Sequence, residues 1–219
     1  MNYPVKIIKK QWLTNNVIQL VLNRPDNYQY KIGQGIELKI ESTDLKKNAA
    51  PFTLTNLEDD NYLELIIKIY PDHEGFTNSL SQLQIGDSLL ISEAWDSYNY
   101  KGEGVFIAGG SGITPFIPMI RNLKSKVNNH KLIYANRSSN DIILKEELTD
   151  LLSHNFINIL SQEKDSIYDF GMITKDYLKE KIQDFQQFFY LCGPNGFSEA
   201  IKQNLIALGA DGNKIQIGY

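Results

Sequence analysis

The sequence predicts two domains, an N-terminal antiparallel Greek-key β-barrel over residues 1–101 and a C-terminal α/β domain with a five-stranded parallel sheet over residues 102–219. Two observations support this fold class. Before the glycine-rich stretch 101–104, short apolar runs alternate with turn clusters, and several runs alternate apolar and polar residues at period two. After it, apolar runs alternate with stretches of helical periodicity, the pattern of parallel strands joined by right-handed crossovers.

The strands expected in the barrel are short and regularly spaced. They cover residues 17–22, 36–40, 63–69 and 88–91, with a further strand at 52–55. Corners are expected at 33–35, 58–61 and 85–87, where Gly, Asn and Asp gather. Strands at this spacing are typical of a small antiparallel barrel.

In the second domain, strands are expected at 105–107, 131–134, 156–160, 188–191 and 214–217. The first helix follows from apolar residues at helical spacing over 116–123, with Thr114 as its N-cap and Pro115 in its first turn. The second covers 144–152, and the third contains Tyr177 and Ile182. The fourth helix carries a stripe of apolar residues over 197–208, and Gly209 is expected to end it.

Composition excludes several classes of function. The chain has 219 residues and a formal net charge of −4, which gives no support for a nucleic-acid surface. Its single cysteine excludes a disulfide framework, a zinc ribbon and an internal iron–sulfur cluster. His73, His130 and His154 lack ligand spacing, so no metal site is expected. The absence of a signal peptide and of any long apolar run predicts a cytoplasmic protein without membrane insertion.

Two glycine-rich corners, at 108–115 and 192–197, each follow an apolar run and precede a helical pattern. In a parallel sheet both would open on one crevice at the carboxyl ends of the strands. Backbone N–H groups at a helix start suit a pyrophosphate, and Gly110 and Gly112 allow its approach. A turn that serves only packing remains the alternative. The third glycine position of the usual dinucleotide fingerprint holds Pro115, which disfavours an ordinary Rossmann dehydrogenase.

Two side chains near these corners are candidates for chemistry. Arg137, after the second parallel strand, either pairs with a phosphate or lies solvated near Asp141, Glu146 and Glu147. Asn136 and Arg137 also stand where a dinucleotide site usually places Asp or Glu for the ribose. Cys192 is by itself most simply a small buried apolar group. If both corners line one cleft, its sulfur lies close to the reacting atoms.

The ordered set of a barrel, Ala-Gly-Gly-Ser-Gly-Ile-Thr-Pro at 108–115, Asn-Arg-Ser at 136–138 and Cys-Gly-Pro at 192–194 resembles the ferredoxin/flavodoxin–NAD(P)H reductase superfamily. The resemblance covers essentially the whole chain. It implies a FAD-binding barrel followed by a pyridine-nucleotide domain, with the flavin at their junction.

The resemblance also implies flavin-site residues. The family motif Arg-x-Tyr-Ser/Thr reads Ala-Pro-Phe-Thr at 50–53, so Phe52 would pack on the flavin and the Thr53 hydroxyl would bond near N5, a catalytic position. A family Gly followed by Ser/Thr-x-x-Leu matches 75–80 and would meet the pyrophosphate; Thr77 alone reads as a helix cap. The cofactor-binding positions implied in this half are Phe52, Thr53, Leu54, Thr55, Ile67, Lys68, Tyr70, His73, Gly75, Phe76 and Thr77.

Ala50 departs from the family, which has an arginine there to neutralise a FAD phosphate. Loss of that charge-assisted contact costs about 1.5–3 kcal/mol. Three outcomes stay open: FAD binds weakly, Lys46, Lys47 or His73 replaces the arginine, or FMN is the flavin.

In the nucleotide half, the resemblance places Thr114 against the nicotinamide or its diphosphate and Cys192, the second catalytic position, beside the reacting C4. Ser161-Gln162 stands where NADP-specific relatives often carry Ser-Arg, so NADH is at least as good a candidate as NADPH. Tyr219 either stacks on the flavin or frays. The binding positions implied here are Gly110, Ser111, Gly112, Thr114, Arg137, Cys192, Gly193, Pro194 and Tyr219.

The implied function is transfer of electrons from NADH or NADPH through FAD to a separate carrier such as flavodoxin, ferredoxin or an oxygenase component. One alternative is a reductase of free flavin, ferric chelate or quinone. The other is a redox-inactive nucleotide-binding subunit or sensor, which Ala50 supports.

Overall fold

The structure is a computed structural model that describes residues 3–40, 49–71 and 75–218. The chain forms two compact units. The first comprises residues 1–99 together with 117–122, and the second comprises residues 100–116 together with 123–219.

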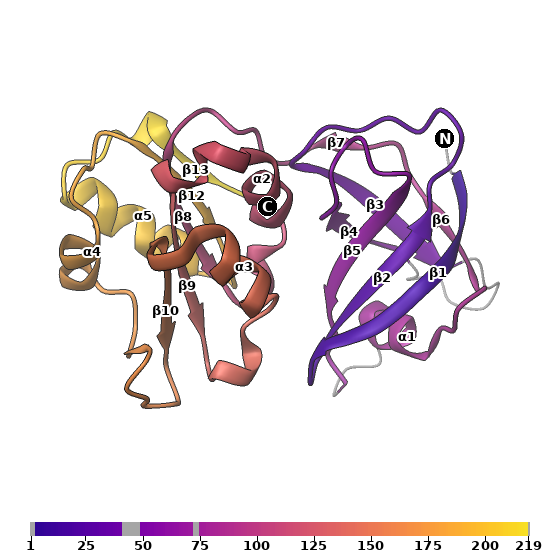
Figure 1. Ribbon diagram of the computed structural model, residues 1–219, viewed down its shortest axis with the longest axis horizontal. Coiled ribbons are helices and arrows are strands. Elements are labelled where there is room, and N and C mark those ends of the chain that lie inside the picture. Colours follow the sequence, from indigo (N-terminus) through magenta and orange to yellow (C-terminus); the bar gives the residue numbers. More distant parts are fainter. Residues whose placement is uncertain (1–2, 41–48, 72–74, 219) are drawn as a thin grey trace. The chain divides into compact units, whose positions relative to one another are not determined.

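The first unit is an antiparallel sheet (Figure 1). Its elements are β1 (Tyr3–Thr14), β2 (Val17–Asn23), β3 (Gln34–Ile40), β4 (Ala49–Thr53), β5 (Tyr62–Lys68), α1 (Phe76–Gln82), β6 (Ser88–Ile91) and β7 (Trp95–Asp96). The strand order is β4-β3-β6-β1-β2-β5, with β7 on β3. Just after β4, the Thr55 N–H donates to the Glu64 carbonyl of β5 at 2.9 Å, which brings the two ends of the sheet together. This confirms the antiparallel, barrel-like N-terminal fold.

The sequence analysis missed the long strand β1. Its pairing with β2 shifts register between Ile7 and Lys9, the mark of a bulge, so Ile7 is buried and Ile8 is half exposed. This shift, together with the lysines of the strand, breaks the period-two alternation by which strands are recognised.

The second unit is a parallel sheet of six strands rather than five. They are β8 (Gly104–Gly109), β9 (Lys131–Asn136), β10 (Phe156–Leu160), β11 (Asp169–Phe170), β12 (Phe188–Cys192) and β13 (Ile215–Ile217), in the order β11-β10-β9-β8-β12-β13. The missed strand, β11, has two residues, too few to show periodicity.

Helices join these strands (Figure 1): α2 (Phe116–Leu123), whose residues 117–122 belong to the first unit, α3 (Lys145–Leu152), α4 (Lys175–Lys181) and α5 (Phe197–Ala207). Leu178 of α4 and Leu205 of α5 belong to one core cluster with Ile107 and Phe189 of the sheet. Short 3-10 turns complete the unit: η1 (Gly110–Ile113), η2 (Lys124–Asn129), η3 (Ser139–Asp141), η4 (Ser153–Asn155) and η5 (Gly212–Lys214).

Two predicted helix caps are wrong, and one predicted helix end is confirmed. The first glycine corner coils directly into η1, so Thr114 already has helical φ and ψ and Pro115 occupies the cap position of α2. Thr77 lies inside α1, whose N-cap is Gly75. Gly209 follows the last turn of α5 with a φ of +98°, a left-handed conformation that favours glycine.

Candidate functional site

The glycine corners lie at the point where the parallel sheet reverses its strand order. β8 and β12 are neighbours, with Cys192 opposite Ala108. From β8 the chain continues to β9 on one side, and from β12 it continues to β13 on the other. In open α/β sheets such a switch point forms a crevice outside the carboxyl ends of the strands, and ligands bind there.

The two corners pack directly on each other through their backbones. A Cβ atom added to Gly112 would lie 2.3 Å from the Cys192 carbonyl oxygen and 2.7 Å from the Gly193 nitrogen. Only glycine fits this approach. The structure thus brings together Gly110, Ser111 and Gly112 of one corner with Cys192 and Gly193 of the other.

Buried polar side chains of β9 lie next to the first glycine corner, residues 108–115. The Tyr134 hydroxyl donates to the Gly110 carbonyl at 2.9 Å, and burial raises the pKa of Tyr134 far above its ordinary value, so this hydroxyl remains a donor. The buried side chain of Asn136 lies beside the same Tyr134 hydroxyl. These polar side chains of β9 hold the first corner in place.

A carboxylate lies at the same edge, over the ends of β9 and β10. The Ser139 N–H and hydroxyl both donate to Glu163 at 2.8 Å. The Gln162 N–H donates to the Arg137 carbonyl at 2.9 Å, which holds the two loops together. The Arg137 side chain is exposed and forms no ion pair within the described part of the chain, and Asp141 instead accepts from the N–H and hydroxyl of Ser138.

The sequence analysis missed Glu163 at this edge. Glu163 is the first carboxylate after the predicted strand 156–160, and that position was its only available signal.

The remaining candidates of this unit are accessible to different degrees. Cys192, at the end of β12, is half-buried, as are Ser111 and Thr114. Pro194 is exposed. Tyr219 lies outside the described residues.

In the first unit, the predicted flavin platform consists of two aromatic rings. Phe52 of β4 and Phe76 of α1 are partly buried and stacked, with ring centroids 6.2 Å apart and planes at 29°. Thr53, Gly75 and Thr77 are half-buried. Tyr70 is exposed, and the Lys68 ammonium lies 5.7 Å from the centroid of its ring. This apolar platform fits a flavin ring, whereas Ala50 brings no charge for a phosphate.

Three of the predicted cofactor-binding residues, Leu54, Thr55 and Ile67, are almost completely buried. Their contact with a cofactor stays a prediction. The Thr55 hydroxyl donates to the Glu64 carboxylate at 2.6 Å. Arg121 also donates to Glu64, at 2.7 Å, which makes Thr55 part of a buried polar cluster of the first unit.

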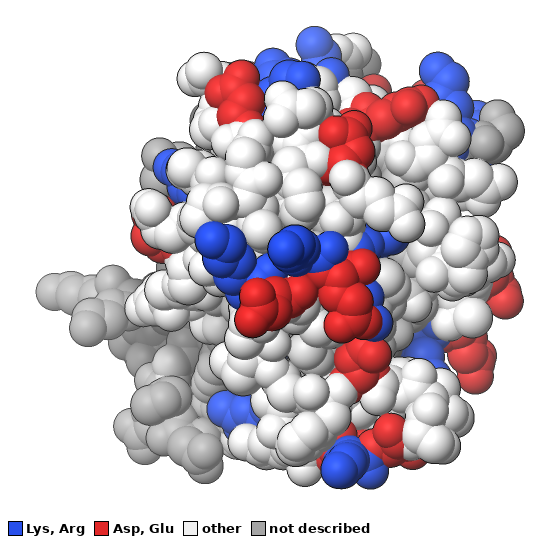
Figure 2. Space-filling model, turned by 90° about the vertical axis from the view of Figure 1, so that its left-hand side faces the viewer, with Lys and Arg blue, Asp and Glu red and all other residues white. Residues whose placement is uncertain are grey.

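His73, Lys46 and Lys47 lie outside the described residues. Within residues 3–40, 49–71 and 75–218, no cluster of His, Cys, Asp or Glu has the composition of a metal site. No helix in these ranges combines the length and the apolarity needed to cross a membrane. Figure 2 shows one face of the molecule, on which basic and acidic side chains lie side by side without a patch of one sign.

Comparison with known proteins identifies both the flavin-binding and the nucleotide-binding part of the chain. An FAD-binding domain family matches residues 2–101, and an oxidoreductase NAD-binding domain family matches residues 106–203. NADH–cytochrome b5 reductase 1 of Arabidopsis thaliana is 30% identical over 93% of this chain and 79% of its own length. The CS-b5R domains of human Ncb5or, in the NAD+ form, superpose with a TM-score of 0.87 at 25% identity, over 100% of this chain and 70% of that one. The flavohem-like FAD/NAD-binding domain of nitric oxide dioxygenase from Vibrio cholerae gives 0.84 at 23% identity, over 98% and 96%.

Proposed function

This chain belongs to the ferredoxin reductase-like superfamily of FAD- and NAD(P)H-dependent oxidoreductases, and we propose that it oxidises NADH in preference to NADPH and passes the electrons to a separate carrier protein. The preference and the carrier are the proposed parts.

The observation that carries the NADH preference is the position of Glu163. Its carboxylate lies at the nucleotide edge of the sheet, held by both donors of Ser139. An acidic side chain at this edge accepts hydrogen bonds from ribose hydroxyls and repels a 2′-phosphate. Because like charges repel, we expect kcat/KM for NADH to exceed that for NADPH by about ten- to hundredfold, or roughly 1.4–2.7 kcal/mol. Arg137 is the opposing charge nearby, and its exposed guanidinium weakens the repulsion without removing it.

The chain itself has three tasks in this reaction. The glycine corners present backbone N–H groups to the dinucleotide, because Gly110 brings no side chain and Gly112 lets the two corners pack together. Phe52 and Phe76 supply an apolar surface for the flavin ring. Cys192 lies at the end of β12 beside the first corner, where it positions the nicotinamide. Bound FAD supplies the redox chemistry, accepting two electrons from NADH and releasing them singly.

The acceptor is proposed to be a separate molecule because one cysteine cannot hold an iron–sulfur cluster with four thiolates. Flavodoxin, ferredoxin and an oxygenase component remain candidates. The printed name of the Arabidopsis relative adds cytochrome b5 to them.

The test is steady-state turnover of the FAD-loaded protein with NADH or NADPH and, in turn, cytochrome b5, ferredoxin and flavodoxin. We expect saturation with at least one carrier and a kcat/KM for NADH at least tenfold above that for NADPH. Turnover of free flavins, ferric chelates or quinones without saturation by any carrier would favour the second candidate reaction. A protein that takes up no FAD would favour a nucleotide sensor.

A further inference from the structure

The outer edge of β10 is only partly covered. β11 pairs with it at Ile159 and Leu160, and there is no pairing at 156–158 within the described residues. The Gly171 N–H donates to the Leu160 carbonyl. Because backbone groups of alternate residues point the same way in a strand, those of Asn158 and Phe156 also face this edge. The Phe156 N–H is already bonded to the Ser153 carbonyl.

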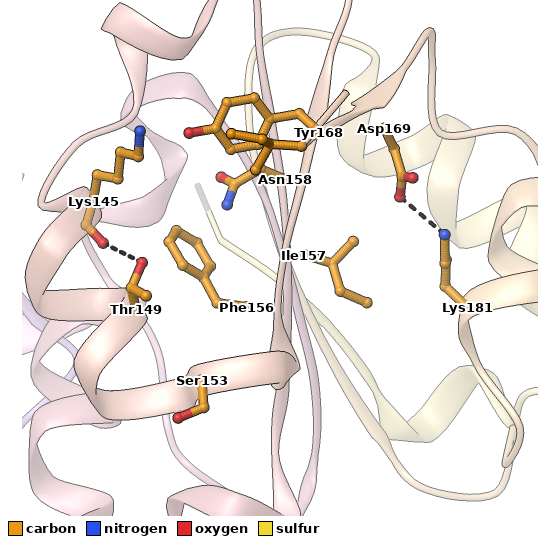
Figure 3. A pocket seen from close by; sticks show the side chains of 10 residues that line it. Lys145, Thr149, Ser153, Phe156, Ile157, Asn158, Tyr168, Asp169 and Lys181 are labelled. Carbon is orange, nitrogen blue, oxygen red and sulfur yellow. Dashed lines mark hydrogen bonds and ion pairs between the residues drawn. The ribbon is translucent and has the colours of Figure 1, made fainter. Parts of the chain in front are cut away.

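A cavity of about 520 Å³ lies along this uncovered stretch (Figure 3). It borders β10 from both faces of the sheet. Phe156 and Asn158 lie on the side of α3 and Lys145, and Ile157 lies on the other side with Lys181 of α4. A compact ligand bound on one face would not contact the residues that line the other face. A strand added to the edge would use both faces, because its successive side chains point in opposite directions.

The cavity also contains an unsatisfied polar group. Asn158 is 8% exposed, and its side-chain oxygen is buried without a partner among the described residues. Figure 3 shows its carboxamide on the side of Phe156 and Lys145. Buried acceptors are almost always hydrogen-bonded in native proteins, so this one indicates a donor that arrives with a ligand.

The lysines of the two faces differ in their ion pairs. On the α4 face, Lys181 is already paired with Asp169 and with Glu180, each at 3.0 Å, and Ile157 is apolar. On the α3 face, the Lys145 ammonium lies 5.2 Å from the centroid of the Tyr168 ring, and a hydrogen bond with Tyr168 and the charges of Asp165 and Glu146 raise the pKa of Lys145. Lys145 forms no ion pair within the described residues, so an acidic side chain suits the α3 face, and an apolar one suits the α4 face.

We propose that the edge of β10 at residues 156–158 binds an extended segment of a partner protein in which acidic and apolar residues alternate. The segment adds a short strand beside β10. Its acidic side chains reach Lys145, its apolar ones cover Ile157, and a donor of the segment satisfies Asn158. This site is separate from the glycine corners, which lie at the carboxyl ends of β8 and β12.

The experiment titrates the 15N-labelled full chain with acetyl-Val-Asp-Val-Asp-Val-amide up to millimolar concentration and follows the amide resonances. We expect saturable shifts at 156–158 and 167–169, with none at Ile215–Ile217, the opposite edge of the sheet. A peptide with Lys in place of both Asp residues, and one N-methylated at alternate amides, should each bind at least fivefold more weakly.

Lys145→Glu should weaken binding of the Asp peptide by about fivefold, in the range of an exposed ion pair. Lys175→Glu makes the same charge change at an exposed position outside the cavity and should leave binding unchanged. Both lysines are exposed, so neither variant endangers folding, and both should keep NADH oxidation intact. The proposal is overturned by absent shifts, by equal binding of the Lys or N-methylated peptide, by equal shifts at β13, or by a second copy of this chain occupying the edge.

Discussion

Ser139 gives both of its donors, the backbone N–H and the hydroxyl, to the carboxylate of Glu163 at 2.8 Å each. The pair joins the loop after β9 to the loop after β10, at the carboxyl edge where the glycine corners lie. A negative charge is therefore held at the nucleotide edge by the fold itself.

Neutralising this charge should relax the choice of nucleotide. In Glu163→Gln the amide oxygen still accepts from Ser139, whereas the repulsion of a 2′-phosphate is gone. We expect the ratio of kcat/KM for NADPH to that for NADH to rise about tenfold, or roughly 1.4 kcal/mol. Asp150→Asn, at an exposed position of α3, is the matched control and should leave the ratio unchanged. An unchanged ratio in Glu163→Gln would remove the main support for an NADH preference.

The contact between the two corners predicts a strong effect at Gly112. In Gly112→Ala the new methyl group would lie 2.3 Å from the Cys192 carbonyl oxygen, so the corners must separate. We expect a loss of about 1–3 kcal/mol in the free energy of unfolding and a raised KM for NADH. Denaturant unfolding and steady-state kinetics measure both. Gly212→Ala is the control, because the nearest atom to its added methyl group is 4.0 Å away.

Most of the fold was predictable because its strands carry strong patterns. The stretches 17–22, 88–91 and 156–160 became β2, β6 and β10 almost to the residue. β1 was missed because a bulge interrupts its alternation, and β7 and β11 because two residues have no period. In all three strands the periodicity by which strands are recognised is broken or absent.

The candidate site was predictable at the glycines, where the shape of the backbone determines it. It was less predictable where burial determines which way a side chain points. Thr55 follows a flavin-like motif, yet tertiary contacts turn its hydroxyl toward Glu64. Glu163 carries no motif, and only the pairing of β9 with β10 brings it to Ser139. Contacts between residues far apart in sequence decide such positions.

Replacing Ala50 by the arginine of the family motif should strengthen FAD binding. Ala50 is half-buried on β4, at the position of the arginine in the Arg-x-Tyr-Ser/Thr motif that residues 50–53 resemble. A charge-assisted phosphate contact is worth about 1.5–3 kcal/mol, so we expect Ala50→Arg to lower the Kd for FAD by roughly tenfold or more. Quenching of FAD fluorescence measures the change, and Ala49→Arg, at the exposed neighbouring position, serves as control. Equal affinity in both variants would show that another residue already fills the phosphate site.

The buried ring of His130 leads us to expect that the folded protein loses stability in weak acid. Its Nδ1–H donates to the Lys126 carbonyl at 3.0 Å, so Nε2 accepts from the Tyr100 hydroxyl at 2.9 Å, and burial lowers the pKa of the ring. The unfolded chain therefore binds the proton more readily than the folded one. Stability should be complete above about pH 6.5 and fall as pH drops below it, by up to about 1.4 kcal/mol per pH unit.

Denaturant midpoints between pH 5 and 8 test this effect of His130. In His130→Phe the fall below pH 6.5 should be shallower, on top of a general loss from altered packing. His154→Gln changes an exposed histidine and should keep the slope of the unmodified protein. An identical slope in His130→Phe would assign the pH dependence to other groups.

Cys192 is expected to act on the nicotinamide rather than on the flavin. Cys192→Ala should slow flavin reduction by NADH roughly tenfold through poorer alignment, while the Kd for FAD changes less than twofold. Rapid mixing under anaerobic conditions measures the rate, and fluorescence quenching measures the Kd. An unchanged rate of single-turnover reduction would leave Cys192 a packing residue only.

The most direct measurement mixes the FAD-loaded protein with one equivalent of NADH under anaerobic conditions and follows the visible absorbance of the flavin. We predict complete bleaching with NADH, at least tenfold faster than with NADPH. A protein that has bound FAD and keeps its flavin absorbance with both nucleotides would contradict the proposed electron transfer.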